Sequence, residues 1–212
     1  MDSTINNDPF IYIEDNVLDK PFCKHLIDKF ENDTRPVWGE TNAGVDLSMK
    51  KSKDLLITDY TDWKQEDTIF CDILGKKINQ YNEHLDKRIP LTSFITNQPI
   101  ELTCIRGAHG NNVIDCGYQI QKTEPGDGYT WHDDFFVDAV NGIRHLTYVF
   151  YLNDVDEGWT QFHNGNQVQP KTGRLLLFPS TWNYIHQGYP PKQDKYIVTG
   201  WVSESIEKVL NK

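Results

Sequence analysis

The sequence predicts one α+β domain that is mostly β, with helices flanking a sandwich or jelly-roll core. Helical periodicity is concentrated in the first half of the chain. From about residue 95 onward, short aromatic and β-branched runs alternate with Gly, Pro, Asn and Asp. No internal repeat or long linker divides the 212 residues. We therefore predict a single domain over residues 1–212, with helical support over about 1–95 and the β core over about 96–203.

Two helices are predicted in the first half. The first follows a strand-like stretch, "FIYI", and begins behind Asp19 and Pro21, with apolar residues at three-to-four-residue spacing: Phe22, Cys23, Leu26, Ile27 and Phe30. The second covers residues 62–86 after a Thr61 or Asp62 cap, with one apolar face formed by Ile69, Phe70, Ile73, Leu74, Ile78, Tyr81 and Leu85. A last short helix is expected at residues 204–212. The first two helices should pack together or on a sheet.

The second half contains four clear strand predictions: "VIDCGYQIQ", "RHLTYVFYL", "GRLLLF" and "KYIVTGWV". Turn signals separate them, namely "EPGDG", "NDVDEG", "HNGN" and "GYPP". Strands so closely spaced favour antiparallel pairs in a sandwich or jelly roll over a parallel sheet with crossover helices.

Composition disfavours some classes of function. The chain has 21 basic and 31 acidic residues and a net charge of −10, which disfavours a phosphate backbone as the main partner. No apolar stretch approaches the roughly 20 residues that span a bilayer, and no signal peptide is recognisable, so we expect a soluble, cytoplasmic protein without a membrane partner. The four cysteines lack CxxC spacing. Reduced thiols are expected, with a Cys104 to Cys116 disulfide as the alternative.

One short stretch, "YTWHDDFF", concentrates residues suited to metal chemistry. His132 and Asp134 are two apart, so in extended chain their side chains leave from one face. The best third ligand is His186 in "WNYIHQGYPP". Two histidines and one carboxylate leave open positions on iron(II) and suit oxygen-activating chemistry, whereas zinc hydrolysis has no other support. The alternatives are an exposed turn or salt-bridged pair, and Asp133 as the ligand if the strand register shifts by one residue.

A lysine is expected to provide an anion-binding group near this site. Lys195 lies on the strand predicted after His186, among apolar and aromatic residues. A lysine that points into such an interior needs an anionic partner, which a dicarboxylate cosubstrate would supply. The alternative is a surface lysine beside Asp194.

These residues lie within an ordered series of segments: "KTEPGDGYTWHDDFF", "RHLTYVFYLNDVDEGWTQF", "VQPKTGRLLLF" and "IHQGYPPKQDKYIVTGW". The series resembles the catalytic core of the iron(II) and 2-oxoglutarate-dependent dioxygenases, specifically the prolyl 4-hydroxylase-like branch. The resemblance covers roughly residues 113–203, and more weakly the start of the chain, where "FIYIEDNVLDKPFCKHLIDKFE" and "KKSKDLLI" look like that branch's first helix and following strand.

The resemblance implies a double-stranded β-helix, or jelly roll, packed against the N-terminal helices. It implies that His132, Asp134 and His186 hold Fe(II), that 2-oxoglutarate chelates the iron and meets Lys195 at its far carboxylate, and that O2 is the oxidant. Ascorbate is a further cofactor expected from the family.

Some cosubstrate contacts depart from the family pattern. The branch commonly has a tyrosine just before the "EPG" turn, where this chain has Thr123. Tyr129 or Tyr118 is the expected substitute for that hydroxyl, and Thr199 is a further candidate contact. Trp159 stands where the family usually has glycine, and it is expected to flank the mouth of the site together with Trp182.

The leading hypothesis for function is hydroxylation of a prolyl residue in a peptide or protein, with succinate and CO2 as co-products. The alternatives keep the chemistry but act on lysyl side chains, a free amino acid or another small molecule. A rival of another class is a non-catalytic jelly-roll module that binds a sugar, peptide or structural metal. Residues 33–53, polar and weakly periodic, are expected to form a mobile lid. The sequence leaves the oligomeric state open.

Overall fold

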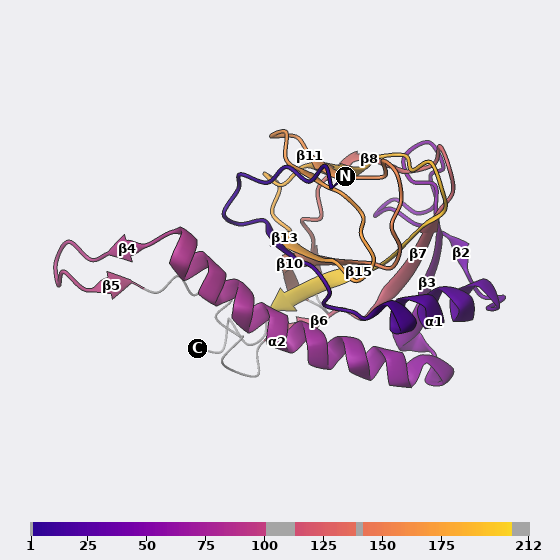
Figure 1. The fold of residues 1–212 in the computed structure, drawn as a ribbon, viewed down its shortest axis with the longest axis horizontal. Coiled ribbons are helices and arrows are strands. Elements are labelled where there is room, and N and C mark those ends of the chain that lie inside the picture. Colours follow the sequence, from indigo (N-terminus) through magenta and orange to yellow (C-terminus); the bar gives the residue numbers. More distant parts are fainter. Residues whose placement is uncertain (1, 101–112, 139–141, 205–212) are drawn as a thin grey trace.

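Two facing antiparallel sheets form the centre of the molecule, and two helices cover the outer face of the larger sheet (Figure 1). The computed structural model describes residues 2–100, 113–138 and 142–204. The predicted jelly-roll core with flanking helices is confirmed. The helix predicted at residues 204–212 lies outside the described residues, except for Glu204 at its start.

The larger sheet joins both halves of the chain. Its path runs through β1 (Tyr12–Glu14), β13 (Leu175–Pro179), β10 (Gly142–Tyr151), β15 (Lys195–Glu204), β7 (Gln119–Thr123), β3 (Lys53–Leu56) and β2 (Val37–Trp38). Two short strands pair beside this path, β6 (Val113–Asp115) on β15 and β9 (Val137–Asp138) on β10. The long strands β10 and β15 therefore lie side by side in the middle of the larger sheet.

The smaller sheet has four short strands in the order β12 (Gln167–Val168), β11 (Thr160–Phe162), β14 (His186–Gly188) and β8 (Tyr129–His132). In the β14 and β8 pair, His186 lies directly opposite His132. Residues far apart in the sequence thus become neighbours through sheet pairing.

Both predicted helices are present. Helix α1 (Lys20–Glu31) begins as predicted, because the Asp19 side chain accepts a hydrogen bond of 2.7 Å from the backbone N–H of Phe22. Helix α2 (Lys64–Arg88) follows two 3₁₀ turns, Ile57–Asp59 and Thr61–Trp63. The predicted cap at Thr61 or Asp62 is wrong. Both residues belong to the second 3₁₀ turn. The residue at the cap position is the buried Trp63, whose side chain forms no capping hydrogen bond.

Two clusters of apolar side chains lie on opposite faces of the larger sheet. Along β10, Tyr148 and Phe150 pack with the helices, whereas Val149 and Tyr151 face the smaller sheet. This alternation follows the two-residue period of a strand. From residue 147 to residue 151, the odd-numbered positions of β10 therefore point into the space between the sheets, whereas a register shift between Arg144 and Leu146 interrupts this parity nearer the start of the strand.

The stretch predicted as one strand at residues 113–121 is two strands in the structure. β6 and β7 are separated at Cys116–Tyr118, where Gly117 has a φ of +83°. An L-residue side chain disfavours that conformation, so the glycine permits the break. Cys23 and Cys71 have free thiols, and Cys116 Sγ lies 3.1 Å from Ser203 Oγ. Cys104 lies outside the described residues, so its disulfide with Cys116 stays an open alternative.

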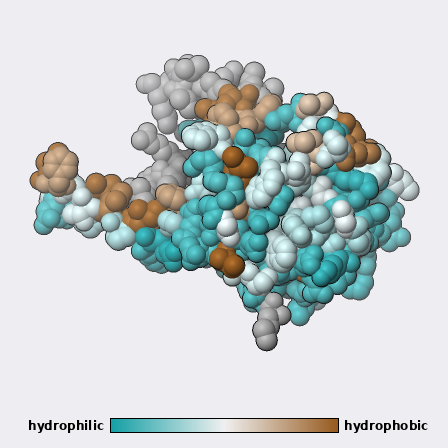
Figure 2. Space-filling model, turned by 90° about the horizontal axis from the view of Figure 1, so that it is seen from above, coloured by the Kyte–Doolittle hydropathy of each residue, from teal (hydrophilic) through white to brown (hydrophobic). Residues whose placement is uncertain are grey.

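One element extends away from the body. Beyond the end of α2, the strands β4 (Leu91–Thr92) and β5 (Pro99–Ile100) form a hairpin that protrudes from the molecule (Figure 1). Brown, apolar atoms gather along this protrusion (Figure 2), and its exposed large apolar residues are Leu91, Phe94, Ile95 and Ile100.

Among the described residues, neither helix is sufficiently long and apolar to span a bilayer.

Candidate active site

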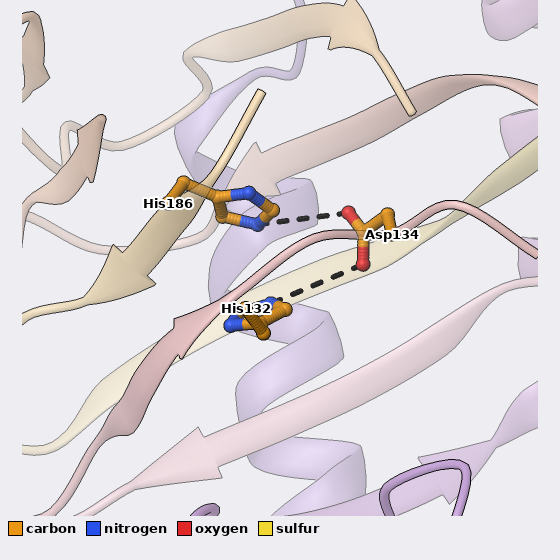
Figure 3. A group of neighbouring side chains, drawn as sticks. All are labelled: His132, Asp134 and His186. Carbon is orange, nitrogen blue, oxygen red and sulfur yellow. Dashed lines mark ion pairs between the residues drawn. The ribbon is translucent and has the colours of Figure 1, made fainter. Parts of the chain in front are cut away.

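Three potential metal ligands converge between the two sheets. His132 ends β8, Asp134 follows two residues later, and His186 begins β14. One ligand atom from each residue lies within 4.8 Å of the others. His132 Nε2 is 3.9 Å from Asp134 Oδ1, and His186 Nε2 is 3.6 Å from Asp134 Oδ2 (Figure 3). Side chains from two strands and a loop therefore point at one common position.

Each imidazole is oriented by a backbone carbonyl. Nδ1 of His132 donates to Thr130 O at 2.7 Å, and Nδ1 of His186 donates to Tyr184 O at 2.9 Å. With the proton on Nδ1, the Nε2 lone pair of each ring is directed toward the common position. Metal-binding histidines usually have such a partner for their other nitrogen.

The protonation states also fit a metal. Burial, followed by the nearby His186, lowers the pKa of His132 to about 4, so its imidazole is neutral at pH 7. Burial alone would raise the pKa of Asp134, but His186, His132 and the hydroxyl of Thr147 together keep it below its ordinary value. Thr147 Oγ1 donates to Asp134 Oδ2 at 2.7 Å. Neutral imidazole and ionised carboxylate are the forms that bind a divalent cation.

Asp133 is placed differently from its neighbours. Its side chain is exposed, and Oδ1 accepts a hydrogen bond of 3.0 Å from the backbone N–H of Phe135. The group that converges within ligand distance comprises His132, Asp134 and His186 and does not include Asp133. The register therefore directs Asp134, not Asp133, toward the two histidines.

The three residues line a cavity between the sheets. Its walls include alternate residues of the central strands, namely Gln121 and Thr123 of β7, Thr147, Val149 and Tyr151 of β10, and Lys195, Ile197, Thr199 and Trp201 of β15. The intervening residues of these strands, such as Ile120 and Val198, pack toward the helices. Strand parity thus determines which side chains reach the cavity.

Lys195 is a buried cation in this cavity. Its side chain is 4% exposed, and Nζ donates to Gly158 O at 3.0 Å. Within the described parts of the chain no carboxylate forms an ion pair with it, and burial lowers its pKa to about 8. A buried ammonium without a carboxylate partner is a favourable binding group for an anion from outside the chain.

The other candidate cosubstrate contacts fall into two groups. Tyr129 and Thr199 line the cavity, although the Thr199 hydroxyl already donates to Tyr148 O at 2.7 Å. Tyr118 lies elsewhere. Its ring packs against Phe70 on the helical side of the sheet, and its hydroxyl donates to Asp115 at 3.0 Å. The structure therefore brings Tyr129 and Thr199, but not Tyr118, to the site.

Sequence reasoning missed a hydroxyl pair in the cavity wall. Tyr151 OH and Thr160 Oγ1 are 2.7 Å apart, and both side chains are buried. Tyr151 could have been found by counting in steps of two along the strand from Thr147, because alternate residues share a face. Thr160 has no such signal, since its position depends on how the smaller sheet faces the larger one.

The segment predicted to be a lid forms one side of the cavity. Glu40, Thr41, Asn42, Lys50 and Ser52 contribute to the lining. Its mobility stays a prediction. Trp159 is not part of this cavity within the described chain: its indole N–H donates to Gln169 at 2.6 Å beside a separate surface hollow.

Part of the β core matches the sequence model of a known superfamily. Residues 118–203 match the sequence model of the 2OG-Fe(II) oxygenase superfamily. No curated protein sequence matches the chain. The matched residues contain His132, Asp134, His186 and Lys195. The resemblance predicted from the sequence is therefore confirmed.

Solved structures with this fold include several prolyl hydroxylases. A prolyl hydroxylase from Trichoplax adhaerens, in complex with a hypoxia inducible factor oxygen degradation domain peptide fragment, has a TM-score of 0.63 and 18% identity, with 97% of this chain and 89% of that chain covered. A Pseudomonas putida prolyl-4-hydroxylase has a TM-score of 0.60 and 14% identity, covering 92% and 93%. The viral collagen prolyl hydroxylase from Paramecium Bursaria Chlorella virus-1, in complex with 2OG, has a TM-score of 0.57 and 17% identity, covering 92% and 96%. At these identities the similarity establishes the fold.

Proposed function

From the 2OG-Fe(II) oxygenase superfamily match of its β core, we propose that this protein is an iron(II)- and 2-oxoglutarate-dependent dioxygenase that hydroxylates prolyl residues of a peptide or protein. Succinate and CO2 are the co-products. One observation carries the proposal: a two-histidine, one-carboxylate set and a buried lysine without a carboxylate partner line the same cavity. The first feature suits iron(II), and the second suits one carboxylate of a dicarboxylate cosubstrate.

Each side chain has a defined task in this proposal. His132, Asp134 and His186 hold the iron, which when bound supplies the oxygen-activating chemistry. Lys195 binds the far carboxylate of 2-oxoglutarate. Tyr129 covers one face of the His132 ring, with ring centroids 3.5 Å apart, and so limits rotation of that ligand and its access to water.

The hydroxyl pair of Tyr151 and Thr160 is the further cosubstrate contact that we propose. Both side chains line the same cavity as Lys195, and both residues are buried. A carboxylate gains most from several hydrogen-bond donors in a dry site. The pair would therefore add a donor to the charge of the lysine.

The prolyl substrate is supported by the fold. The three solved structures described above are prolyl hydroxylases, and one of them was solved with a peptide fragment. A net charge of −10 also favours a peptide or protein over nucleic acid as the target.

The test is incubation of the purified protein with iron(II), 2-oxoglutarate, ascorbate and a proline-rich peptide. We expect stoichiometric succinate and a gain of one oxygen atom on proline, measured by mass spectrometry. His186→Ala should abolish succinate release, because two donors remain where three are needed. Omitting ascorbate shows whether it is required.

The outcomes separate the alternatives. Succinate release with turnover on lysyl peptides or free amino acids, but not on proline, would reject the prolyl substrate and keep the reaction class. Absence of iron(II) binding under anaerobic conditions would reject the oxygenase itself and favour a non-catalytic binding module.

A further inference from the structure

A buried group of polar side chains lies beside the proposed metal ligands and has no part in the proposed reaction. Lys50, Ser52 and Asp54, here called the polar clamp, are each no more than 5% exposed. Lys50 Nζ donates to Asp54 Oδ2 at 2.6 Å, and Ser52 Oγ donates to Asp54 Oδ1 at 2.7 Å. Asp54 thus accepts a hydrogen bond on each oxygen from a neighbour in the same short segment.

The chain is packed tightly around the clamp. A Cβ atom added at Gly39 would lie 2.5 Å from Asp54 Oδ2, 2.6 Å from Ser52 Oγ and 2.7 Å from Lys50 Cε. The backbone N–H of Gly39 also donates to Ser52 O at 3.0 Å. Any other residue at position 39 would displace the clamp, so the glycine leaves the space that the three side chains occupy.

The Tyr129 ring lies between the clamp and the proposed metal ligand His132. Lys50 Nζ lies 5.4 Å from the centroid of the Tyr129 ring, within the range of a cation–π contact. The Tyr129 ring in turn stacks on the ring of His132, with centroids 3.5 Å apart and planes 11° apart. A continuous series of contacts therefore runs from Asp54 through Lys50 and Tyr129 to a proposed iron ligand.

The backbone reinforces the same connection. Lys50 and Tyr129 form an isolated antiparallel bridge. On either side of it, Lys51 N donates to Gly128 O at 2.8 Å and Thr130 N donates to Met49 O at 2.9 Å. The segment with the clamp continues into β3 of the larger sheet, so it links that sheet to β8, the strand that ends in His132.

We infer that Lys50 is a positioning residue for the metal site: held by Asp54, its ammonium fixes the Tyr129 ring, which holds the His132 imidazole in the orientation that binds the metal. The inference rests on the proposed function, because it assumes that His132 binds a metal. A buried ion pair is weak support for stability by itself. Its contact with an aromatic ring that stacks on a ligand gives the pair a role in orientation, as outer contacts of metal-binding histidines commonly have.

The test measures Mn(II) binding to the apoprotein by calorimetry, which requires no turnover. The main variant is Lys50→Met/Asp54→Asn, which removes both charges and leaves no unpaired ion. Since loss of an outer contact of a ligand typically weakens metal affinity by 10- to 100-fold, we expect a Kd increase of about tenfold in the folded double variant. Lys50→Arg keeps a cation over the ring and should retain most of the affinity.

A matched control separates positioning from general damage. Lys53 lies in the same segment, and its Nζ is 3.7 Å from the centroid of the Trp38 ring, but it does not line the cavity. Lys53→Met therefore removes a cation–π contact of the same kind and should leave Mn(II) affinity within twofold.

Three results would overturn the inference: a folded double variant that binds Mn(II) within twofold of the parent, an equal loss in Lys53→Met, or a loss of affinity in folded Lys50→Arg as large as that in the double variant. Failure of the parent itself to bind Mn(II) is a different outcome, because it would reject the proposed metal site and with it the proposed function.

Discussion

Two lysines line the same cavity, and the regions around them differ in one respect. Lys50 is 5% exposed and is paired with Asp54, whereas Lys195 is 4% exposed and has a backbone carbonyl but no carboxylate partner in the described residues. In the first region, the buried ammonium has its counter-ion within the chain. In the second region the ammonium has no counter-ion among the described residues, which is why we propose that an anion binds there. Burial of a charge is therefore informative about function when its counter-ion is missing.

The largest expected effect is the loss of stability when the Lys50–Asp54 ion pair is broken. Lys50→Met leaves Asp54 as a buried carboxylate without its cation, and removal of one partner of a buried pair typically costs about 3–5 kcal/mol of unfolding free energy. Urea denaturation monitored by Trp fluorescence measures the change. Lys195→Met removes a cation without a counter-ion, so in the absence of 2-oxoglutarate it should not destabilise the protein. Equal losses in the two variants would contradict the comparison.

The next effect concerns 2-oxoglutarate binding at Lys195. Lys195→Ala removes the cation proposed to pair with the far carboxylate of 2-oxoglutarate. Truncation of one side of a buried charged contact costs about 2–5 kcal/mol, so the KM for 2-oxoglutarate should rise by roughly 30-fold or more. The kcat at saturating cosubstrate should change much less. A lower kcat with an unchanged KM would place Lys195 outside the cosubstrate site.

A smaller effect follows from the titration of the same lysine. Burial lowers the pKa of Lys195 to about 8, below its ordinary value of 10.5, so the folded protein releases this proton before the unfolded chain does. Because the ammonium is the form proposed to bind the anion, 2-oxoglutarate affinity should fall about tenfold between pH 7 and pH 9. By the same linkage, the contribution of Lys195 to stability without ligand should rise from about pH 8 to pH 10.5. Lys195→Arg should remove both dependences, because arginine stays protonated.

The smallest effect concerns the hydroxyl pair beside Lys195. Tyr151→Phe keeps the ring and removes the hydroxyl that lies 2.7 Å from Thr160 Oγ1. A single hydrogen bond contributes about 0.5–1.5 kcal/mol, so the KM for 2-oxoglutarate should rise by about 2- to 10-fold. Tyr118→Phe is the matched control, because Tyr118 lies on the helical side of the sheet and should leave this KM unchanged. A larger effect at Tyr118 than at Tyr151 would contradict the assignment of the cavity wall.

Local sequence patterns predicted much of the fold. Asp19 and the spacing of Cys23, Leu26 and Phe30 predict α1, because a cap and an apolar stripe depend on neighbours within a few residues. The break between β6 and β7 was missed because an isolated glycine is equally compatible with a strand and with a positive φ.

The prediction of Tyr118 as a cosubstrate contact shows where local patterns cease to suffice. Tyr118 and Ile120 face the helices, whereas Gln121 and Thr123 reach the cavity. Which face of a strand is the inner one depends on what packs against it, so the sequence indicated the aromatic residue but not its direction.

The sequence by itself determined the chemistry available to this protein: an HxD pair, a distant histidine and a lysine in an apolar strand. Only the tertiary structure decided which of these and other side chains meet. The pairing of β14 with β8 places His186 opposite His132, and the segment before β3 places Lys50 against Tyr129. The physical reason is that side-chain identity and strand alternation are local properties, whereas convergence depends on sheet pairing between segments that are distant along the chain.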